Sequence, residues 1–159
     1  MKKKVLFILM PKQFQDLEFN TPYVALTAHH HVDIAGLQPG NALGELGIEY
    51  TPNKLLANMT PQDLSMYDAL VIPGGQGAPT YLWGNTLVHN VLSQFHGNKK
   101  LICLICNACD LLLESGILDK NRMNNLREEC VVDTKENLIT VKNQKLVKDF
   151  ADAVLKALE

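Results

Sequence analysis

Three short segments carry side chains that together suit covalent chemistry. They are Gln15-Asp16-Leu17-Glu18, Gly74-Gly75 and Cys106-Asn107. A thiolate at Cys106 attacks electrophilic carbon, and the backbone N–H groups of Gly75 and Asn107 can receive the negative oxygen that develops. A carboxylate at Glu18 can hydrogen-bond the sulfur and set its ionisation. These residue types predict a site for acyl or carbonyl transfer with Cys106 as the nucleophile.

Cys106 comes directly after an apolar run, with no loop before the next element. Residues 101–105 predict a buried strand, and residues 108–115 predict a helix. A strand that turns straight into a helix pushes the side chain between them into a strained, exposed position. A free cysteine titrates at about 8.5, and a helix N-terminus commonly lowers that pKa. The alternative is a small buried side chain, because free cysteine is among the most buried residue types.

The rest of the chain alternates between strand and helix patterns. Strands are predicted over residues 5–10, 32–37, 68–73 and 101–105, with a terminal pair at 131–132 and 138–141. Helices are predicted over residues 16–28, 87–95, 108–115 and 146–158, and a short helix begins at Thr60. Residues 40–52 predict a small excursion or a hairpin. This alternation predicts a doubly wound, mostly parallel sheet. The three segments each follow a strand, so they meet at the carboxyl edge of that sheet.

Composition predicts a single domain over residues 1–159, with 47% apolar content and a formal net charge of −2. No basic stripe indicates a nucleic-acid partner, and no apolar run approaches the roughly 20 residues that span a bilayer. Lys2-Lys3-Lys4 and the apolar run after them resemble a signal peptide, but Pro11 follows where a small-residue cleavage site is needed. We therefore expect a cytoplasmic protein without nucleic-acid or membrane partners.

The remaining cysteines and histidines offer further hypotheses. Cys103, Cys106 and Cys109 have the spacing of an iron–sulfur ligand run, but an extended apolar strand cannot wrap around a cluster. Cys109 lies one helical turn beyond Cys106, which leaves a resolving-thiol role open. The tract 29–31 is all histidine, yet it lies at a predicted helix end, where the dipole favours imidazolium. We predict no cofactor and no metal.

The chain resembles the ThiJ/PfpI superfamily, which includes the parkinsonism-associated deglycase and the class I glutamine-amidotransferase-like domains. The matching segments are residues 16–18, 67–75, 105–108 and 137–140, of which 68–75 (Asp-Ala-Leu-Val-Ile-Pro-Gly-Gly) is the most specific. The resemblance runs over nearly the whole chain and implies a flavodoxin-like sheet sandwiched by helices. It also implies a homodimer in which Cys106 is the nucleophile or redox centre and Glu18 is its partner.

The sequence departs from the family pattern near the cysteine. Protease-like members carry a histidine directly after it, whereas this chain has Asn107. Deglycase-like members carry a histidine further along the chain, but the corresponding residues 122–126 contain none. Lys142-Asn143-Gln144 replaces the usual Gly-Pro, and Leu104 stands where a small residue is normal. These departures remove the usual base from the predicted site.

Four functional hypotheses follow. The first is a cysteine-dependent enzyme of the glyoxalase or deglycase type, acting on small reactive carbonyls. The second is a non-enzymatic, redox-sensing or stress-protective (chaperone-like) protein, in which an oxidant converts Cys106 to a sulfenic or sulfinic acid that Glu18 holds. The third is an intracellular peptidase or amidase, which Asn107 disfavours. The fourth is a family member without chemistry.

Overall fold

A seven-stranded sheet forms the centre of the protein in a computed structural model that describes residues 1–159. In chain order its strands are β1 (Lys4–Leu9), β3 (His31–Gly36), β6 (Lys54–Leu55), β7 (Ala69–Ile72), β8 (Leu101–Ile105), β9 (Val131–Asp133) and β10 (Leu138–Val141). Their spatial order is β6-β3-β1-β7-β8-β10-β9. All neighbours pair in parallel except β9, which runs antiparallel to β10 at one edge. The predicted mostly parallel α/β fold is confirmed.

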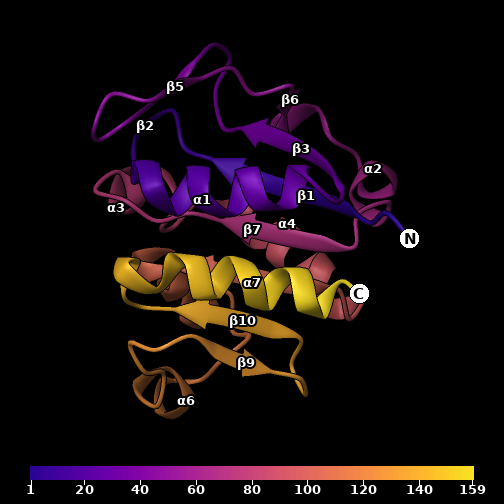
Figure 1. The fold of residues 1–159 in the computed structure, drawn as a ribbon, viewed down its shortest axis with the longest axis vertical. Coiled ribbons are helices and arrows are strands. Elements are labelled where there is room, and N and C mark those ends of the chain that lie inside the picture. The colour runs from indigo at the N-terminus through magenta and orange to yellow at the C-terminus, as the bar shows by residue number, and fades with distance from the viewer.

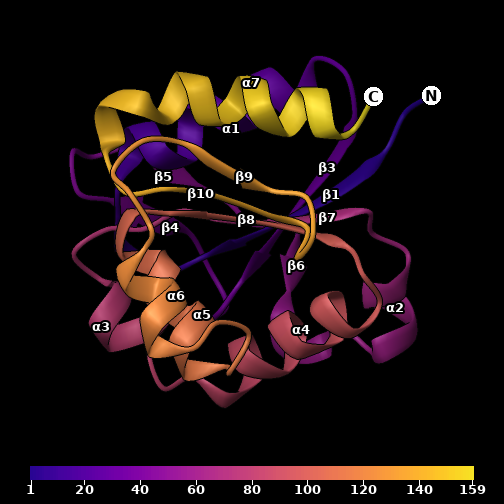
Figure 2. The same cartoon turned by 90° about the horizontal axis from the view of Figure 1, so that it is seen from below.

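Helices cover both faces of this sheet (Figures 1 and 2). The helices α1 (Asp16–Thr27) and α7 (Val147–Ala157) lie together on one face. The other face carries α2 (Pro61–Ser65), α3 (Ala78–Tyr81), α4 (Thr86–Gly97), α5 (Leu111–Glu114) and α6 (Lys120–Asn124). Short 3₁₀ segments complete the chain: η1 (Leu56–Asn58), η2 (Cys106–Asp110) and η3 (Gln144–Leu146). None of the helices combines the length and the apolar character that crossing a membrane would require.

The central strands are apolar on both sides because helices cover both sides. Every residue of β7 is buried, and β8 is buried from its second residue onward. On the face covered by α1, Phe7 of β1 meets the rings of Phe19 and Tyr23 edge-on, with centroids 5.9 and 6.0 Å apart. This packing fixes α1 against the sheet, and so fixes the position of its first turn at the carboxyl edge.

Short elements differ most from the sequence predictions. The hairpin predicted within residues 40–52 is confirmed as β4 (Ala42–Gly44) and β5 (Glu49–Tyr50), which β2 (Lys12–Phe14) extends into a small second sheet. The single helix predicted over 108–115 is instead η2 followed by α5. The sequence did not predict β2, β6, α3 or α6, because elements of two to five residues are too short to show hydrophobic periodicity.

Candidate active site

Cys106 forms a strand-to-helix elbow, as the sequence predicts. It is the first residue of η2 and directly follows the fully buried Ile105 at the end of β8. Its φ is 52°, in the left-handed region, where a side chain destabilises the backbone by roughly 1–3 kcal/mol. The thiol is half-buried. Strain of this kind persists where the surroundings hold it, and here it presents the sulfur at the carboxyl edge of the sheet.

Glu18 lies beside this thiol in the first turn of α1. Its side chain is only 3% exposed, and its Oε1 accepts the Gly74 N–H at 2.9 Å. The carboxyl lines the same pocket as the Cys106 thiol, close enough for its charge to raise the pKa of that thiol. Gln15 fixes the helix start, because its Oε1 accepts the Glu18 N–H at 2.9 Å while its own N–H donates to the Gly74 carbonyl at 2.8 Å. The predicted pairing of Glu18 and Cys106 is therefore present in the geometry.

Burial controls the ionisation of the pair. It raises the pKa of Glu18 above its ordinary value, although hydrogen bonds from Cys106 and Gly74 act in the opposite direction. Burial, the negative charge of Glu18 and the hydrogen bond to it together raise the pKa of Cys106 to about 12. This direction is opposite to the lowering expected of a cysteine at a helix start. At neutral pH the pair holds at least one proton, and the two groups titrate together.

Gly74 and Gly75 must both be glycine for the site to close. A Cβ on Gly74 would lie 2.4 Å from Asn107 Oδ1. Gly75 has a φ of +145°, and a Cβ there would lie 2.3 Å from the Gln13 carbonyl oxygen. Asn107 binds Gly75 at both backbone polar groups: Oδ1 accepts its N–H at 3.0 Å, and Nδ2 donates to its carbonyl at 2.7 Å. The Gly75 N–H predicted as an oxyanion donor is therefore occupied by the Asn107 side chain.

Trp83 supports the elbow from the other side. Its indole Nε1–H donates to the Asn107 carbonyl at 2.9 Å. Asn107 thus has partners at its carbonyl and at both side-chain atoms, and its own N–H lies in the first turn of η2, where N–H groups have no acceptor within the helix.

The pocket at Cys106 is open, with a volume of about 290 Å³. Besides Gly75, it is lined by Gln15, Glu18, Glu45, Gln76, Cys106, Asn107 and Gln144. Two carboxylates are present in this set, and no lysine, arginine or histidine. Sequence reasoning missed Glu45, Gln76 and Gln144. Gln76 could have been found from its place after Gly74-Gly75, but nothing in the sequence brings Glu45 to the site.

The histidines and the other cysteines of the chain do not line this pocket. His89 Nε2 pairs with Glu114 at 2.8 Å, and His96 Nε2 pairs with Glu136 at 3.0 Å, so neither replaces the missing base. Cys103 and Cys109 are both fully buried, and burial raises the pKa of each thiol. No three histidine, cysteine or acidic side chains are grouped so that they could hold a metal ion.

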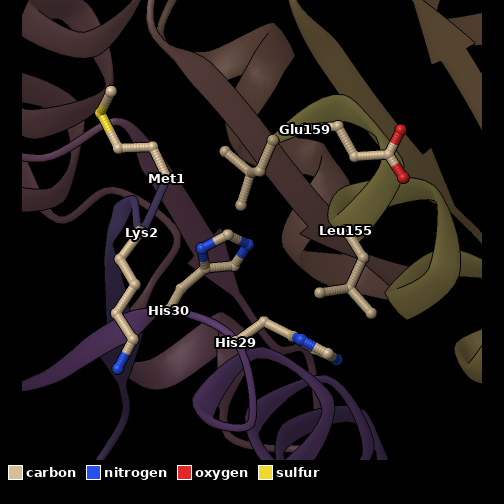
Figure 3. A pocket seen from close by; sticks show the side chains of 7 residues that line it. Met1, Lys2, His29, His30, Leu155 and Glu159 are labelled. Carbon is tan, nitrogen blue, oxygen red and sulfur yellow. The ribbon is translucent and has the colours of Figure 1, made fainter.

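A cavity of about 570 Å³ lies at the opposite end of the strands, where the two chain termini lie close together (Figures 1 and 3). The rings of His29 and His30 face Leu155 across it, and Lys2 lies on its wall. His30 Nδ1 accepts the Lys3 N–H at 3.1 Å, which fixes that ring to the chain before β1. The histidine tract thus belongs to the amino edge, remote from Cys106.

The fold and the site together define a class of α/β-sandwich proteins built around one cysteine. The cysteine lies on a left-handed elbow after a parallel strand, beside a buried glutamate and a glycine pair. The model of the DJ-1/PfpI family matches residues 3–157, and the chain belongs to this family. The resemblance to the ThiJ/PfpI superfamily is confirmed.

Individual relatives agree with this assignment. The uncharacterized protein MJ0967 of Methanocaldococcus jannaschii is 30% identical over an alignment that covers 98% of this chain and 82% of that protein. Among solved structures, Drosophila melanogaster DJ-1beta is 27% identical with a TM-score of 0.84, covering 99% of this chain and 91% of the other. A ThiJ/PfpI domain protein from Brachyspira murdochii has a TM-score of 0.86 at 23% identity, with 99% and 98% covered, and it supports the fold.

Proposed function

We propose that this protein is a cysteine-dependent enzyme that acts on small reactive carbonyls, in the manner of glyoxalases or deglycases. One observation carries the proposal: the half-buried Cys106 thiol and the buried Glu18 carboxyl line the same pocket, where each affects the pKa of the other. The two groups open into a pocket of about 290 Å³, a size suited to a small aldehyde. A nucleophile with an acid–base group in contact is the minimum that covalent carbonyl chemistry needs.

The first step forms a hemithioacetal. Cys106 Sγ bonds to the aldehyde carbon, the C=O π electrons move to oxygen, and the thiol proton passes through Glu18 to that oxygen. With a 2-oxoaldehyde, Glu18 then removes the proton from the sulfur-bound carbon, the C–H electron pair forms an enediol, and the former ketone oxygen takes up a proton. Loss of the hydroxyl proton on the sulfur-bound carbon and return of a proton to the neighbouring carbon give the thioester. This oxidises one carbon and reduces the other, so no external oxidant is needed. Water hydrolyses the resulting thioester to a 2-hydroxy acid and frees Cys106.

Glu18 carries the proton transfers alone in this scheme, because no histidine lines the pocket. A positioned acid–base group contributes about 10²–10⁴-fold to such a rate. The raised pKa of Glu18 suits it to this work, because it makes the carboxylate a stronger base and brings the pKa closer to neutral pH. The Asn107 N–H holds the oxygen, while the Gly75 N–H stays bound to Asn107 Oδ1 and orders this part of the pocket.

The test is methylglyoxal consumption by the wild type and by Cys106→Ala. The wild type should consume methylglyoxal and release lactate, and Cys106→Ala should fall to the uncatalysed rate. Cys130→Ser is the matched control, because Cys130 is also a half-buried free thiol but lies outside the pocket, and it should retain full activity. Equal rates in wild type and Cys106→Ala, or no consumption by either, would overturn the proposal.

A redox-sensing role is the second candidate, and the same contact favours it. Peroxide oxidises the Cys106 sulfur to a sulfenic acid while its O–O bond is reduced and water leaves. A protonated Glu18 can then donate a hydrogen bond to the new oxygen. Mild peroxide followed by peptide mapping should show Cys106 oxidised well before Cys130. Similar rates at the two thiols would refute this role. A peptidase role has less support, because the Asn107 amide is bound to Gly75 and carries no titratable group.

We further propose a homodimer that works in the reducing cytoplasm. All four cysteines are free, which supports the compartment. Helix α1 leaves Leu17 and Val24 more than half exposed, which supports a surface that a second copy covers. Light scattering should give twice the 17.7 kDa chain mass, and a monomer at all concentrations would contradict the dimer.

A further inference from the structure

The tip of the β4–β5 hairpin is anchored next to the active site. Asp16, at the start of α1, is only 7% exposed, and both of its carboxylate oxygens are used. Oδ1 accepts the Leu46 N–H and Oδ2 accepts the Ile48 N–H, each at 2.8 Å. A Cβ on Gly44 would lie 2.4 Å from Asp16 Oδ1, so the approach requires glycine there. Asp16 therefore serves to fix the backbone on either side of Gly47 and to place Glu45.

Glu45 is held at the mouth of the Cys106 pocket from both its ends. Its N–H donates to the Phe14 carbonyl at 2.9 Å. Its Oε2 accepts the Gln76 N–H at 2.7 Å, and Gln76 directly follows the glycine pair. The side chain is half-buried and lines the same pocket as Cys106 and Glu18. These two hydrogen bonds keep the Glu45 carboxylate in place as part of the pocket lining.

No cation in the structure offsets this charge within the pocket. Lys12 lines an adjoining hollow of about 420 Å³ that shares Glu45 and Gln76, and Lys142 lies two residues before Gln144. Neither lysine forms an ion pair with Glu18 or Glu45. A substrate with a carboxylate or a phosphate would find no cationic partner near the sulfur and would face like charge at the entrance. Like-charge placement of this kind is how proteins reject partners.

We infer that Glu45 is a specificity-determining residue that makes the site accept uncharged or cationic aldehydes in preference to anionic ones. The choice of aldehydes as substrates rests on the proposed carbonyl chemistry. The selection by charge applies to any electrophile that approaches Cys106. Glu45 acts at the entrance and needs no contact with the reacting carbon. Its role is thus separate from those of Glu18 and Asn107.

The experiment measures alkylation of Cys106 by neutral iodoacetamide and by anionic iodoacetate, with peptide mapping to isolate this thiol. The ratio of the two rate constants is compared with that of glutathione, which corrects for intrinsic reactivity. Glu45→Gln keeps an oxygen to accept the Gln76 N–H and removes only the charge. Its preference for iodoacetamide should fall about threefold at low ionic strength, the size expected of one charge several ångströms away in water. High salt should shrink the difference.

Glu49→Gln is the matched control, because Glu49 lies on the same hairpin, bonds Asn41 at 2.6 Å and stays outside the pocket. It should leave the ratio unchanged. An unchanged ratio in Glu45→Gln, or an equal change in Glu49→Gln, would overturn the inference. Alkylation needs no turnover, so a shifted ratio without methylglyoxal consumption supports charge selection while the proposed enzyme fails. Methylglyoxal consumption by the wild type with an unshifted ratio in Glu45→Gln would support the proposed enzyme and overturn the charge selection.

Discussion

The carboxyl ends and the amino ends of the central strands, here called the carboxyl edge and the amino edge, differ in how their polar groups are hydrogen-bonded. At the carboxyl edge, Glu18 accepts the Gly74 N–H, and Asn107 accepts hydrogen bonds from Gly75 and Trp83. Each of these bonds joins residues far apart in sequence. At the amino edge a cavity about twice as large is lined by basic and apolar side chains and by Glu159. The side chains that line it make one hydrogen bond to a residue distant in sequence, from the Lys3 N–H to His30 Nδ1. The residues that line the smaller pocket therefore make more hydrogen bonds to distant parts of the chain.

This difference shows that the reactive site is identified by the hydrogen bonds among its polar groups and not by the volume of its cavity. A strained cysteine and a buried carboxyl both destabilise the folded chain, and they persist at the carboxyl edge because its hydrogen bonds hold them. The residues that line the amino-edge cavity include no left-handed backbone and no buried charge. Three substitutions test this contrast.

The largest effect is expected for Gly75→Ala. The new Cβ combines an unfavourable φ, which alone destabilises by about 1–3 kcal/mol, with a collision against the Gln13 carbonyl. Gly40→Ala is the control, because Gly40 has a φ of +96° but no atom within 4 Å of the new Cβ. Urea denaturation should show a clearly larger loss of unfolding free energy for Gly75→Ala. Equal losses would mean that the carboxyl edge is no tighter than an ordinary loop.

A smaller, pH-dependent effect is expected for Glu18→Gln. Because the folded-state pKa of Glu18 is raised, its contribution to stability is present below the unfolded pKa and is lost as pH rises through the folded value. Glu18→Gln removes this pH dependence. The melting temperature of the variant should therefore rise relative to that of the wild type as pH rises from about 4 to about 8. Alkylation of Cys106 at neutral pH should also become faster, since the Glu18 charge helps to raise the thiol pKa. A constant difference in melting temperature would contradict the raised pKa.

The smallest effect is expected at the amino edge, for His30→Ala. The change removes the acceptor of the Lys3 N–H, which is worth about 0.5–1.5 kcal/mol. Alkylation of Cys106 should be the same as in the wild type, because the two edges share no contact network. A changed alkylation rate would break the contrast between the edges.

The sequence predicted the long elements and the elbow because their signals are local. The apolar run before Cys106 predicted β8 with its observed bounds, and residues 138–141 did the same for β10. The elbow followed from a strand and a helical segment that adjoin. Glu18 and the glycine pair were found because each follows a strand, and parallel strands end at one edge.

The remainder of the site depends on contacts distant in sequence. Glu45 reaches the pocket because Asp16 anchors the hairpin 30 residues away, a contact that no local pattern encodes. Asn107 was interpreted through the base it lacks, whereas its two bonds to Gly75 became visible only in the fold. The direction of the Cys106 pKa shift was missed as well, because local position favours the thiolate and burial beside Glu18 opposes it.

Trp83 gives the elbow an optical signal of its own. It is the single tryptophan of the chain, and its indole N–H is bound to the carbonyl of the residue that follows Cys106. Light emitted on excitation near 300 nm therefore comes from a ring in contact with the elbow and from nowhere else in the molecule. Indole emission responds to the polarity and hydrogen bonding of its surroundings, so adduct formation or oxidation at the sulfur can be followed in real time without an attached dye.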